Sequence, residues 1–138
     1  MSIRYNINPD IWGPKIWYTW HIVAYGYPEN PSENDKKNYK NFYIYTSKVL
    51  PCDSCKEDST RRLSKVNWNQ VLKSRKTLLQ WTQDYHNEIN KKLDKPLNKD
   101  KNFIQKLKKL TLTDYNLEYI ICTILVIIIL GLLIRKII

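Results

Sequence analysis

The sequence predicts an all-α protein, a small bundle of four or five helices followed by a C-terminal transmembrane helix. Apolar side chains recur with helical period through most of the polar part of the chain. No stretch alternates with the period of two that a half-buried strand requires. The segment 119–134 is almost unbroken Ile, Leu and Val, as in membrane-spanning helices. We therefore expect a folded domain at residues 1–97, a basic amphipathic segment at 98–118 and a membrane anchor at 119–138.

The first helix is expected to begin near Pro14, because proline suits the first position of a helix. It runs to Tyr25 and ends where Gly26, Pro28 and Pro31 interrupt the pattern. Its inward stripe is predicted to consist of side chains at helical spacing: Trp17, Trp20, His21, Ala24 and Tyr25.

The next two helices lie on either side of a proline. Ser32 is a candidate N-cap for a second helix, with an apolar stripe of Tyr39, Phe42, Tyr43, Thr46 and Leu50. A short third helix is expected to hold a Cys-x-x-Cys pattern in its first turn and to continue through Arg62 and Leu63. The stretch VNWNQ, residues 66–70, is interpreted as a connector.

A fourth helix is predicted after Ser74, a second candidate N-cap. Its apolar stripe is expected to consist of Leu78, Trp81, Tyr85, Ile89 and Leu93. The helix is expected to end at Lys95-Pro96, because the residue before a proline is disfavoured in the helical conformation.

The segment 119–134 is interpreted as a membrane anchor rather than a buried hairpin or a core helix. As a helix it would cover about 24 Å, slightly less than a hydrocarbon layer of ~30 Å. Arg135 and Lys136 can extend their charged ends to the interface while the last two isoleucines lengthen the apolar part. A single-pass membrane protein is therefore expected.

A lysine-rich stretch, residues 98–113, precedes this segment and places Phe103, Leu107 and Leu110 on one helical face. It is either a surface that lies on an anionic leaflet or an ordinary solvated lysine face. More lysines flank the N-terminal side of the anchor than the C-terminal side, which places the folded domain in the cytoplasm. The opening residues are polar and do not resemble a secretory signal.

The net charge of +10 makes nucleic-acid binding a function to consider. The lysines are scattered along the chain, however, and no RNA-recognition or zinc-finger pattern occurs. The aromatic residues fall at the spacing of a helical core rather than on a sheet that could stack bases. We therefore expect no nucleic-acid partner.

Cys52 and Cys55 form an isolated Cys-x-x-Cys pattern, and the third cysteine, Cys122, lies in the apolar segment. Such a pattern is half of a zinc site, a redox centre or a chance pair of thiols. A zinc site would need His21 and His86, each about thirty residues from the pair and neither doubled in zinc-finger spacing. A thioredoxin-like centre would need a strand before the motif, where the pattern here is helical.

A redox role does not require the thioredoxin fold. Two sulfurs one turn apart at a helix start are within disulfide reach, and the helix N-terminus lowers the pKa of a thiol. Lys56 would favour the thiolate, and three nearby carboxylates would oppose it: Asp53, Glu57 and Asp58. A bundle dense in tryptophan and tyrosine, with histidines on two helices, could hold a flat aromatic cofactor that accepts the electrons.

Three stretches occur together in one order: WGPKIWYTWHIVAYGYP (12–28), LPCDSC (50–55) and HNEINKKLDKP (86–96). They resemble the W-x-x-x-H helix, the P-C-x-x-C motif and the H-N-x-V-N-x-x-L-G-K-P stretch of the Erv/ALR flavin-linked sulfhydryl oxidases. Three ordered motifs are far more specific than any one of them. The compact, lysine-rich sequence is most similar to the members that large DNA viruses encode.

The resemblance implies a helical bundle that binds FAD non-covalently. The cofactor contacts that it implies are Gly13, Trp17, His21, Tyr25, Cys55, His86, Asn87, Asn90, Lys92 and Lys95. Helical spacing agrees, because Trp17 and His21 share one face, as do His86 and Asn90. Taken singly, these residues also have ordinary structural interpretations, as core aromatics and histidines or as polar surface residues.

The resemblance also implies a thiol oxidase whose catalytic residues are Cys52 and Cys55. A substrate thiolate would attack Cys52, Cys55 would face the flavin, and molecular oxygen would accept the electrons to yield hydrogen peroxide. The implied partners are a dithiol protein and a second copy of this chain. The apolar C-terminal segment adds a membrane, which is a host intracellular or virion membrane if the chain is viral. No metal is expected. The alternative is a zinc-stabilised, membrane-anchored adaptor that uses His21, His86 and both cysteines.

The chain departs from the family pattern at two places. Asp94 replaces the usual glycine before Lys-Pro, and Leu97-Asn98 replaces a common Phe-Asp-Cys ending. No cysteines are present for an additional structural disulfide or for a shuttle pair on a flexible arm. We therefore expect packing and cofactor binding to hold the bundle, and a separate dithiol protein to supply the electrons directly.

Overall fold

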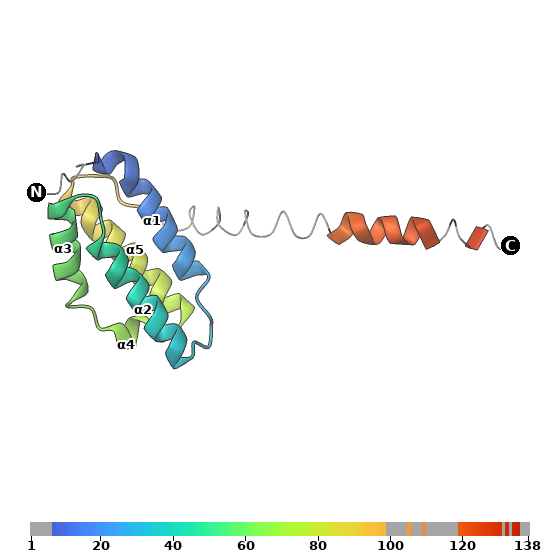
Figure 1. Ribbon diagram of the computed structural model, residues 1–138, viewed down its shortest axis with the longest axis horizontal. Coiled ribbons are helices and arrows are strands. Elements are labelled where there is room, and N and C mark those ends of the chain that lie inside the picture. The colour runs from blue at the N-terminus through green and yellow to red at the C-terminus, as the bar shows by residue number, and fades with distance from the viewer. Residues whose placement is uncertain are drawn as a thin grey trace, which may run out of the picture. The chain divides into compact units, whose positions relative to one another are not determined.

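The computed structural model describes residues 7–98, 105, 109, 119–130, 132, 134 and 135, and it divides into two units, Met1–Asn98 and Lys99–Ile138. Within residues 7–98 the chain forms five helices, α1 (Pro9–Tyr25), α2 (Glu33–Lys48), α3 (Asp53–Leu63), α4 (Trp68–Val71) and α5 (Arg75–Lys92) (Figure 1). The residues that are described include no strand. The predicted all-α class and the small bundle are confirmed.

Helix α1 begins earlier than the predicted start near Pro14. Asn8 is its N-cap and accepts a hydrogen bond from the backbone N–H of Asp10 at 3.0 Å, and Pro9 follows at the start of the helix. Pro14 lies inside the helix. The prediction was wrong because Asn8 and Pro9 provide a better N-terminus, and the cap offsets the backbone hydrogen bond that Pro14 cannot donate.

The predicted N-caps of α2 and α5 are confirmed. Ser32 and Asp35 form a reciprocal capping box, in which the Ser32 hydroxyl accepts from the Asp35 N–H at 3.1 Å and Asp35 Oδ2 accepts from the Ser32 N–H at 2.9 Å. Ser74 and Thr77 form the same arrangement at the start of α5. Each box satisfies backbone donors that the first turn of a helix leaves without partners.

Between α3 and α5 the chain differs from the prediction of a connector at residues 66–70. Trp68–Val71 form one helical turn, α4, which Asn67 caps by accepting from the backbone N–H of Gln70 at 3.3 Å. Trp68 is only 8% exposed and packs into the core. Burial of this large ring holds a turn that is too short for periodicity to reveal.

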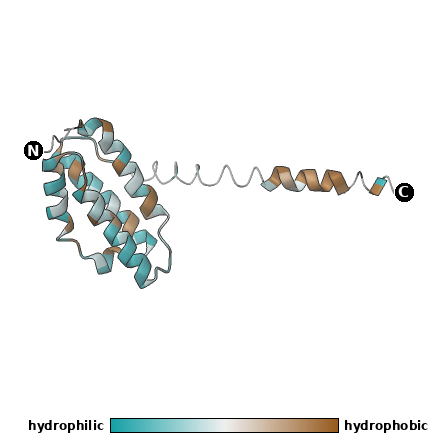
Figure 2. Ribbon diagram, in the orientation of Figure 1, coloured by the Kyte–Doolittle hydropathy of each residue, from teal (hydrophilic) through white to brown (hydrophobic). Residues whose placement is uncertain are grey.

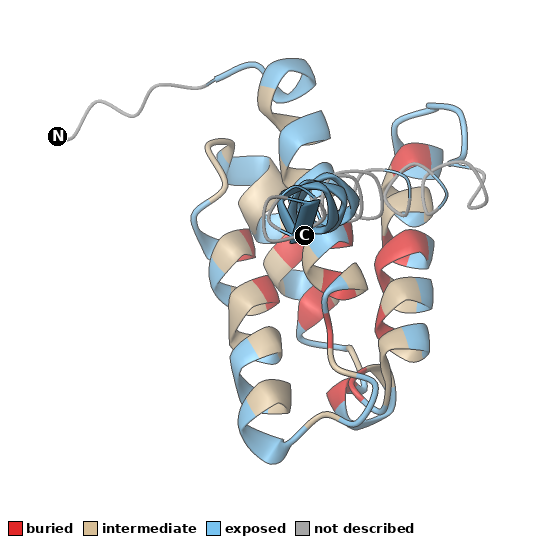
Figure 3. Ribbon diagram, turned by 90° about the vertical axis from the view of Figure 1, so that its right-hand side faces the viewer, coloured by how far each residue is buried: buried red, intermediate tan, exposed pale blue. Residues whose placement is uncertain are grey.

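The core of the bundle is aromatic, and its buried residues lie on the facing sides of the helices (Figure 3). Trp20 packs edge-on against Tyr43, with ring centroids 5.0 Å apart, and the Tyr43 hydroxyl donates to the Trp20 carbonyl at 3.1 Å. Tyr27 donates in the same way to the Leu72 carbonyl at 2.9 Å. Because each phenol has a partner, the rings supply apolar area without an unpaired buried hydroxyl.

The predicted stripes are largely confirmed. On α1, Trp20, His21 and Ala24 are buried, while Trp17 and Tyr25 are half-buried. On α5, Leu78 and Tyr85 are buried, but Leu93 is 54% exposed. The expected end of this helix at Lys95-Pro96 was wrong, because α5 ends at Lys92. Leu93 is its C-cap, and Asp94 takes a positive φ of 53°. A left-handed residue ends the helix before its stripe can continue.

In the second unit, residues 119–130 are helical and predominantly apolar (Figure 2). Across the described portion of the chain, none of the helices has both the length and the hydropathy needed to cross a membrane. Beyond residue 130 the predicted anchor is described only at 132, 134 and 135. Of the predicted juxtamembrane segment, 98–118, the structure describes only residues 98, 105 and 109, so its amphipathic face lies outside the described residues.

The positive φ of Asp94 leads to a testable prediction about stability. Asp94→Gly is expected to stabilise the domain by about 0.5–1 kcal/mol, because glycine adopts this conformation without steric cost. Asp84→Gly is the matched control, since Asp84 lies on the exposed face of α5 and glycine inside a helix costs about 1 kcal/mol. Urea unfolding measures both, and a loss of stability in Asp94→Gly would contradict the prediction.

Candidate functional site

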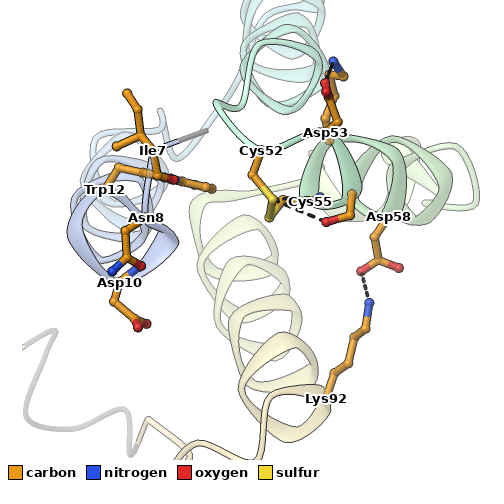
Figure 4. Close-up of a disulfide and its surroundings, with 11 residues drawn as sticks. Ile7, Asn8, Asp10, Trp12, Cys52, Asp53, Cys55, Asp58 and Lys92 are labelled. Atoms are coloured by element: carbon orange, nitrogen blue, oxygen red, sulfur yellow. Dashed lines mark hydrogen bonds and ion pairs between the residues drawn. A yellow bond between two sulfur atoms is a disulfide. The ribbon is translucent and has the colours of Figure 1, made fainter. Parts of the chain in front are cut away.

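Cys52 and Cys55 are joined in a disulfide at the start of α3, with their Cα atoms 5.2 Å apart (Figure 4). Cys52 is the N-cap of the helix, and its sulfur accepts from the backbone N–H of Cys55 at 3.3 Å. Both residues are half-buried. The prediction that the pair occupies the first turn is confirmed. A thiolate formed at Cys52 on reduction would lie against an N–H donor at the positive end of a helix.

The charges near the disulfide are paired with one another. Lys56 bonds Asp53 at 2.6 Å, so the cation expected to favour a thiolate is partly neutralised. Asp58 accepts from Arg61, Arg62 and Lys92. Burial would raise the pKa of Asp58, but these hydrogen bonds outweigh it and lower the pKa to about 2. Asp58 is therefore an anion held by cations, and the opposition to a thiolate expected from it is reduced.

Contacts from Asp58, Ser59 and Arg62 hold α3 against α5. Lys92 lies 3.1 Å from Asp58, Glu88 lies 3.1 Å from Arg62, and the hydroxyls of Tyr85 and Ser59 are 2.9 Å apart. The two ion pairs, Asp58–Lys92 and Arg62–Glu88, follow opposite orders along the two helices, which therefore run antiparallel. Cys55, one turn before Ser59, therefore lies beyond Tyr85, toward the C-terminal half of α5.

The same half of α5 carries a cluster of flat rings that it shares with α1. Trp17 stacks on His86 with ring centroids 4.1 Å apart and an interplanar angle of 7°. His21 Nε2 lies 3.1 Å from His86 Nδ1. Trp17 also contacts Tyr85 edge-on. The tertiary structure thus brings together three of the residues that the resemblance implied, Trp17, His21 and His86, from two helices far apart in sequence.

Both histidines of this cluster are neutral near pH 7. Burial lowers the pKa of His21 from 6.5 to about 4. Burial and, secondarily, the charge of His21 lower the pKa of His86 to about 4. A protonated imidazole in this apolar setting would lose hydration, which disfavours the charged form. The site therefore offers flat, uncharged aromatic surface at neutral pH.

The remaining predicted residues lie in several places. Asn90 is buried, and its carbonyl accepts from the backbone N–H of Lys95 at 2.8 Å. Lys95 bonds Asp10 of α1 at 2.7 Å, and Lys92 bonds Asp58, so both ammonium groups have carboxylate partners. Tyr25 is half-buried on the last turn of α1. Gly13 is half-buried, and a Cβ built there meets nothing within 4 Å.

Asn87 contacts a residue that the sequence interpretation did not include. Its side chain accepts from the Asn98 N–H at 2.8 Å and donates to the Asn98 carbonyl at 3.3 Å. Asn98 in turn reaches His86. Nothing in the sequence beyond Lys95-Pro96 predicts a return toward α5, so Asn98 had no detectable signal.

Trp12 was also not singled out as a site residue, although it opens the first of the three motifs. Its indole N–H donates to the Ile7 carbonyl at 2.9 Å, which fixes the ring. Figure 4 shows Trp12 on α1 directed toward the disulfide from the opposite side of the site. In that view the large apolar side chain of Trp12 faces the disulfide.

The zinc alternative finds no support in the geometry. Cys52 and Cys55 are bonded to each other, and His21 and His86 contact one another instead of converging on the sulfurs. In the described part of the chain, no three His, Cys, Asp or Glu side chains are grouped so that they could hold a metal ion.

Comparison with known proteins assigns this arrangement to a family. Residues 14–109 match the model of the Erv1/Alr family. The matched range includes His21, His86 and the cysteine pair Cys52 and Cys55. The chain belongs to the Erv1/Alr family. The resemblance seen in the three sequence motifs is thereby confirmed.

Viral and fungal proteins of this family share the matched region. A probable FAD-linked sulfhydryl oxidase of Acanthamoeba polyphaga mimivirus is 41% identical over 85 residues, which are 61% of this chain and 59% of that protein. The mitochondrial FAD-linked sulfhydryl oxidase erv1 of Schizosaccharomyces pombe is 32% identical over 98 residues, 70% of this chain and 54% of that protein. This Erv1/Alr chain therefore spans between half and two thirds of the length of these relatives.

Solved structures of Erv1 share the fold. The FAD-binding domain of Erv1 from Saccharomyces cerevisiae superposes with a TM-score of 0.67 at 28% identity, over 75% of this chain and 96% of that one. The yeast Erv1 core superposes with a TM-score of 0.64 at 30% identity, over 77% of this chain and 87% of that one. The five-helix unit therefore has the Erv1 core fold.

Proposed function

We propose that this chain is a FAD-dependent thiol oxidase that forms disulfides in a dithiol partner protein. The observation that carries the proposal is the Cys52–Cys55 disulfide at the start of α3, which is held against α5. Helix α5 also carries His86, which contacts Trp17 and His21 of α1. The names of the viral and fungal relatives, which are FAD-linked sulfhydryl oxidases, support the same activity.

The residues of the site fit a flavin cofactor. Trp17 and His86 offer parallel flat rings, and both imidazoles are uncharged at neutral pH. Beside them, Trp20 Nε1 is a buried donor that has no hydrogen-bond partner in the described part of the chain. The space next to Gly13 is open. The residues proposed to hold FAD are Gly13, Trp17, His21, Tyr25, Cys55, His86, Asn87, Asn90, Lys92 and Lys95.

The two cysteines exchange their disulfide with the substrate. A substrate thiolate attacks Cys52 Sγ, the bond to Cys55 breaks, and Cys55 leaves as a thiolate. The second substrate thiolate attacks the substrate sulfur of this mixed disulfide, so the substrate leaves oxidised and Cys52 is released beside the N–H of Cys55. The cysteine pair then holds the two electrons. FAD, when bound, supplies a two-electron acceptor that oxygen reoxidises with hydrogen peroxide as product.

The test uses the purified full chain in detergent. It is expected to show flavin absorbance at one FAD per chain and to consume oxygen when a dithiol is added. Hydrogen peroxide is expected to accumulate in equal amount to the disulfide formed. A folded, colourless protein that ignores dithiols would overturn the proposal, and stoichiometric zinc without flavin in the same preparation would favour the adaptor instead.

Gly13 provides a sharper test of the cofactor site. Gly13→Ala is expected to raise the stability of the flavin-free protein by about 0.5–1 kcal/mol, because alanine is the better helix residue. The same methyl group is expected to weaken flavin binding at least about tenfold by occupying the space beside the helix.

Gly26→Ala is the matched control for this substitution. A Cβ at Gly26 would make ordinary contacts with carbonyls of the last turn of α1, at 3.6 and 3.8 Å. Flavin fluorescence titration should show little change for Gly26→Ala. Equal flavin affinity in Gly13→Ala and the wild-type chain would remove Gly13 from the site.

The proposal includes a membrane anchor at residues 119–138, with the oxidase domain facing the cytoplasm and the anchor in a host intracellular or virion membrane. The apolar run of the sequence and the helical residues 119–130, whose side chains are exposed, support it. Alkaline carbonate should leave the expressed chain in the membrane pellet. Release of the wild-type chain, or unchanged retention of an Ile127→Lys, Ile128→Lys variant, would overturn the anchor.

The proposal also includes a homodimer. An exposed apolar stripe on α1, formed by Ile11, Tyr18 and Ile22 at 61%, 41% and 40% exposure, supports pairing through a helix face. Light scattering of the detergent-solubilised chain should give the mass of two protomers, and Ile22→Glu should reduce it to one. A monomeric wild-type chain would overturn the dimer.

A further inference from the structure

Asp58 gathers three cations at the contact between α3 and α5. Its Oδ1 lies 2.5 Å from Arg61 Nη2, and its Oδ2 lies 3.1 Å from both Arg62 Nε and Lys92 Nζ. The Asp58 side chain is only 14% exposed. A single ion pair at the surface contributes little, but a half-buried carboxylate that accepts from three cationic donors is a well-fixed anion. The low pKa of Asp58, about 2, agrees with this arrangement.

This cluster of charges lies on the side of α3 that carries Cys55. Residues three apart on a helix are neighbours, with Cβ atoms about 5–6 Å apart, so Cys55 and Asp58 share one face of α3. Figure 4 shows the pair of Asp58 and Lys92 about one turn along the helix from the disulfide. A thiolate that forms at Cys55 when the disulfide opens is therefore within range of these charges.

The balance of charge around Cys55 decides how stable that thiolate is. Glu88 of α5 adds a second carboxylate to the cluster, so Asp58 and Glu88 together offset two of its three positive charges. At the start of the helix, Lys56 is likewise paired with Asp53 at 2.6 Å. Unpaired cations at these positions would stabilise the thiolate, and a cysteine pair whose reduced form is strongly stabilised keeps its electrons.

We infer that Asp58 sets the redox balance of the Cys52–Cys55 pair by neutralising the cations that α3 and α5 bring beside Cys55. Asp58 is thus a positioning residue, which acts through the charges that it holds. The inference deepens the proposed function and rests on it for its effect on turnover. It also gives Lys92, which the resemblance assigned to the cofactor, a second role as the partner of Asp58.

The experiment equilibrates the purified full chain, in detergent and without oxygen, with mixtures of glutathione and glutathione disulfide at pH 8. Two glutathione molecules reduce the Cys52–Cys55 disulfide to a dithiol and leave as one glutathione disulfide, so alkylation of the free thiols gives the equilibrium constant. Asp58→Asn is expected to raise the ratio of dithiol to disulfide about tenfold, because a negative charge beside the thiolate is lost. Asp84→Asn is the matched control, since it removes the same charge from the exposed face of α5, and its ratio should equal that of the wild-type chain.

Lys92→Met separates this electrostatic role from simple loosening of the helix contact. Loss of the cation should lower the ratio of dithiol to disulfide, and its addition to Asp58→Asn should return the ratio toward the wild-type value. The inference requires opposite shifts in the two single variants, and equal or parallel ratios would overturn it. Should Asp58→Asn not fold, Lys92→Met decides the question alone. A wild-type chain that binds no flavin would overturn the proposed function instead, while the glutathione equilibrium would still decide the role of Asp58.

Discussion

Substitution of serine for either Cys52 or Cys55 is expected to abolish dithiol oxidation, by roughly 10³-fold or more, because no disulfide remains to exchange with the substrate. Each variant should keep most of its flavin absorbance, since serine closely matches cysteine in size and the ring cluster of Trp17, His21 and His86 is built from α1 and α5. Oxygen consumption with dithiothreitol and the visible spectrum measure the two properties on the same sample.

The matched control for both substitutions is Cys122→Ser. Cys122 is a free, exposed cysteine in the second unit, remote in sequence from the disulfide. Its substitution should leave turnover and flavin content unchanged. Wild-type activity in Cys52→Ser or in Cys55→Ser would contradict the assigned exchange, whereas loss of activity in Cys122→Ser would show that the third thiol takes part.

Acidification from pH 6.5 to about 4 is expected to destabilise the flavin-free domain by on the order of 3 kcal/mol for each of its two histidines. The folded protein keeps His21 and His86 neutral down to about pH 4, whereas the unfolded chain protonates them near pH 6.5. The unfolded state therefore binds more protons in this window, so stability is fully present above pH 6.5 and decreases as the pH falls. Thermal unfolding between pH 7.5 and 4.0 measures the loss.

Two observations can isolate the histidines as the cause. A His21→Gln, His86→Gln variant should show a much flatter dependence between pH 6.5 and 4, although it is less stable at neutral pH. Asp58 contributes in a separate window, because its pKa is lowered from 3.8 to about 2 and its stabilisation is lost only as the pH falls below about 3.8. A wild-type melting temperature that is constant from pH 6.5 to 4.5 would contradict the prediction.

The sequence alone determined the features that depend on neighbouring residues. Ser32 and Ser74 were identifiable as N-caps because a cap bonds the backbone two or three residues ahead of it. The aromatic stripes of α1 and α5 follow from helical period, and the position of the cysteine pair in the first turn of α3 follows from spacing. The three ordered motifs were sufficient to identify the family.

Tertiary structure alone decided which of these residues meet. His21 and His86 are 65 residues apart in sequence and contact each other because α1 and α5 pack together. The pairing of Lys92 with Asp58 and the turn at Trp68 likewise depend on what each element packs against. Asn98 is the clearest case, because two distant hydrogen-bond partners on α5, and no local periodicity or cap, bring it to His86. Local patterns specify helices, but the contacts between helices depend on long-range packing that no short stretch of sequence encodes.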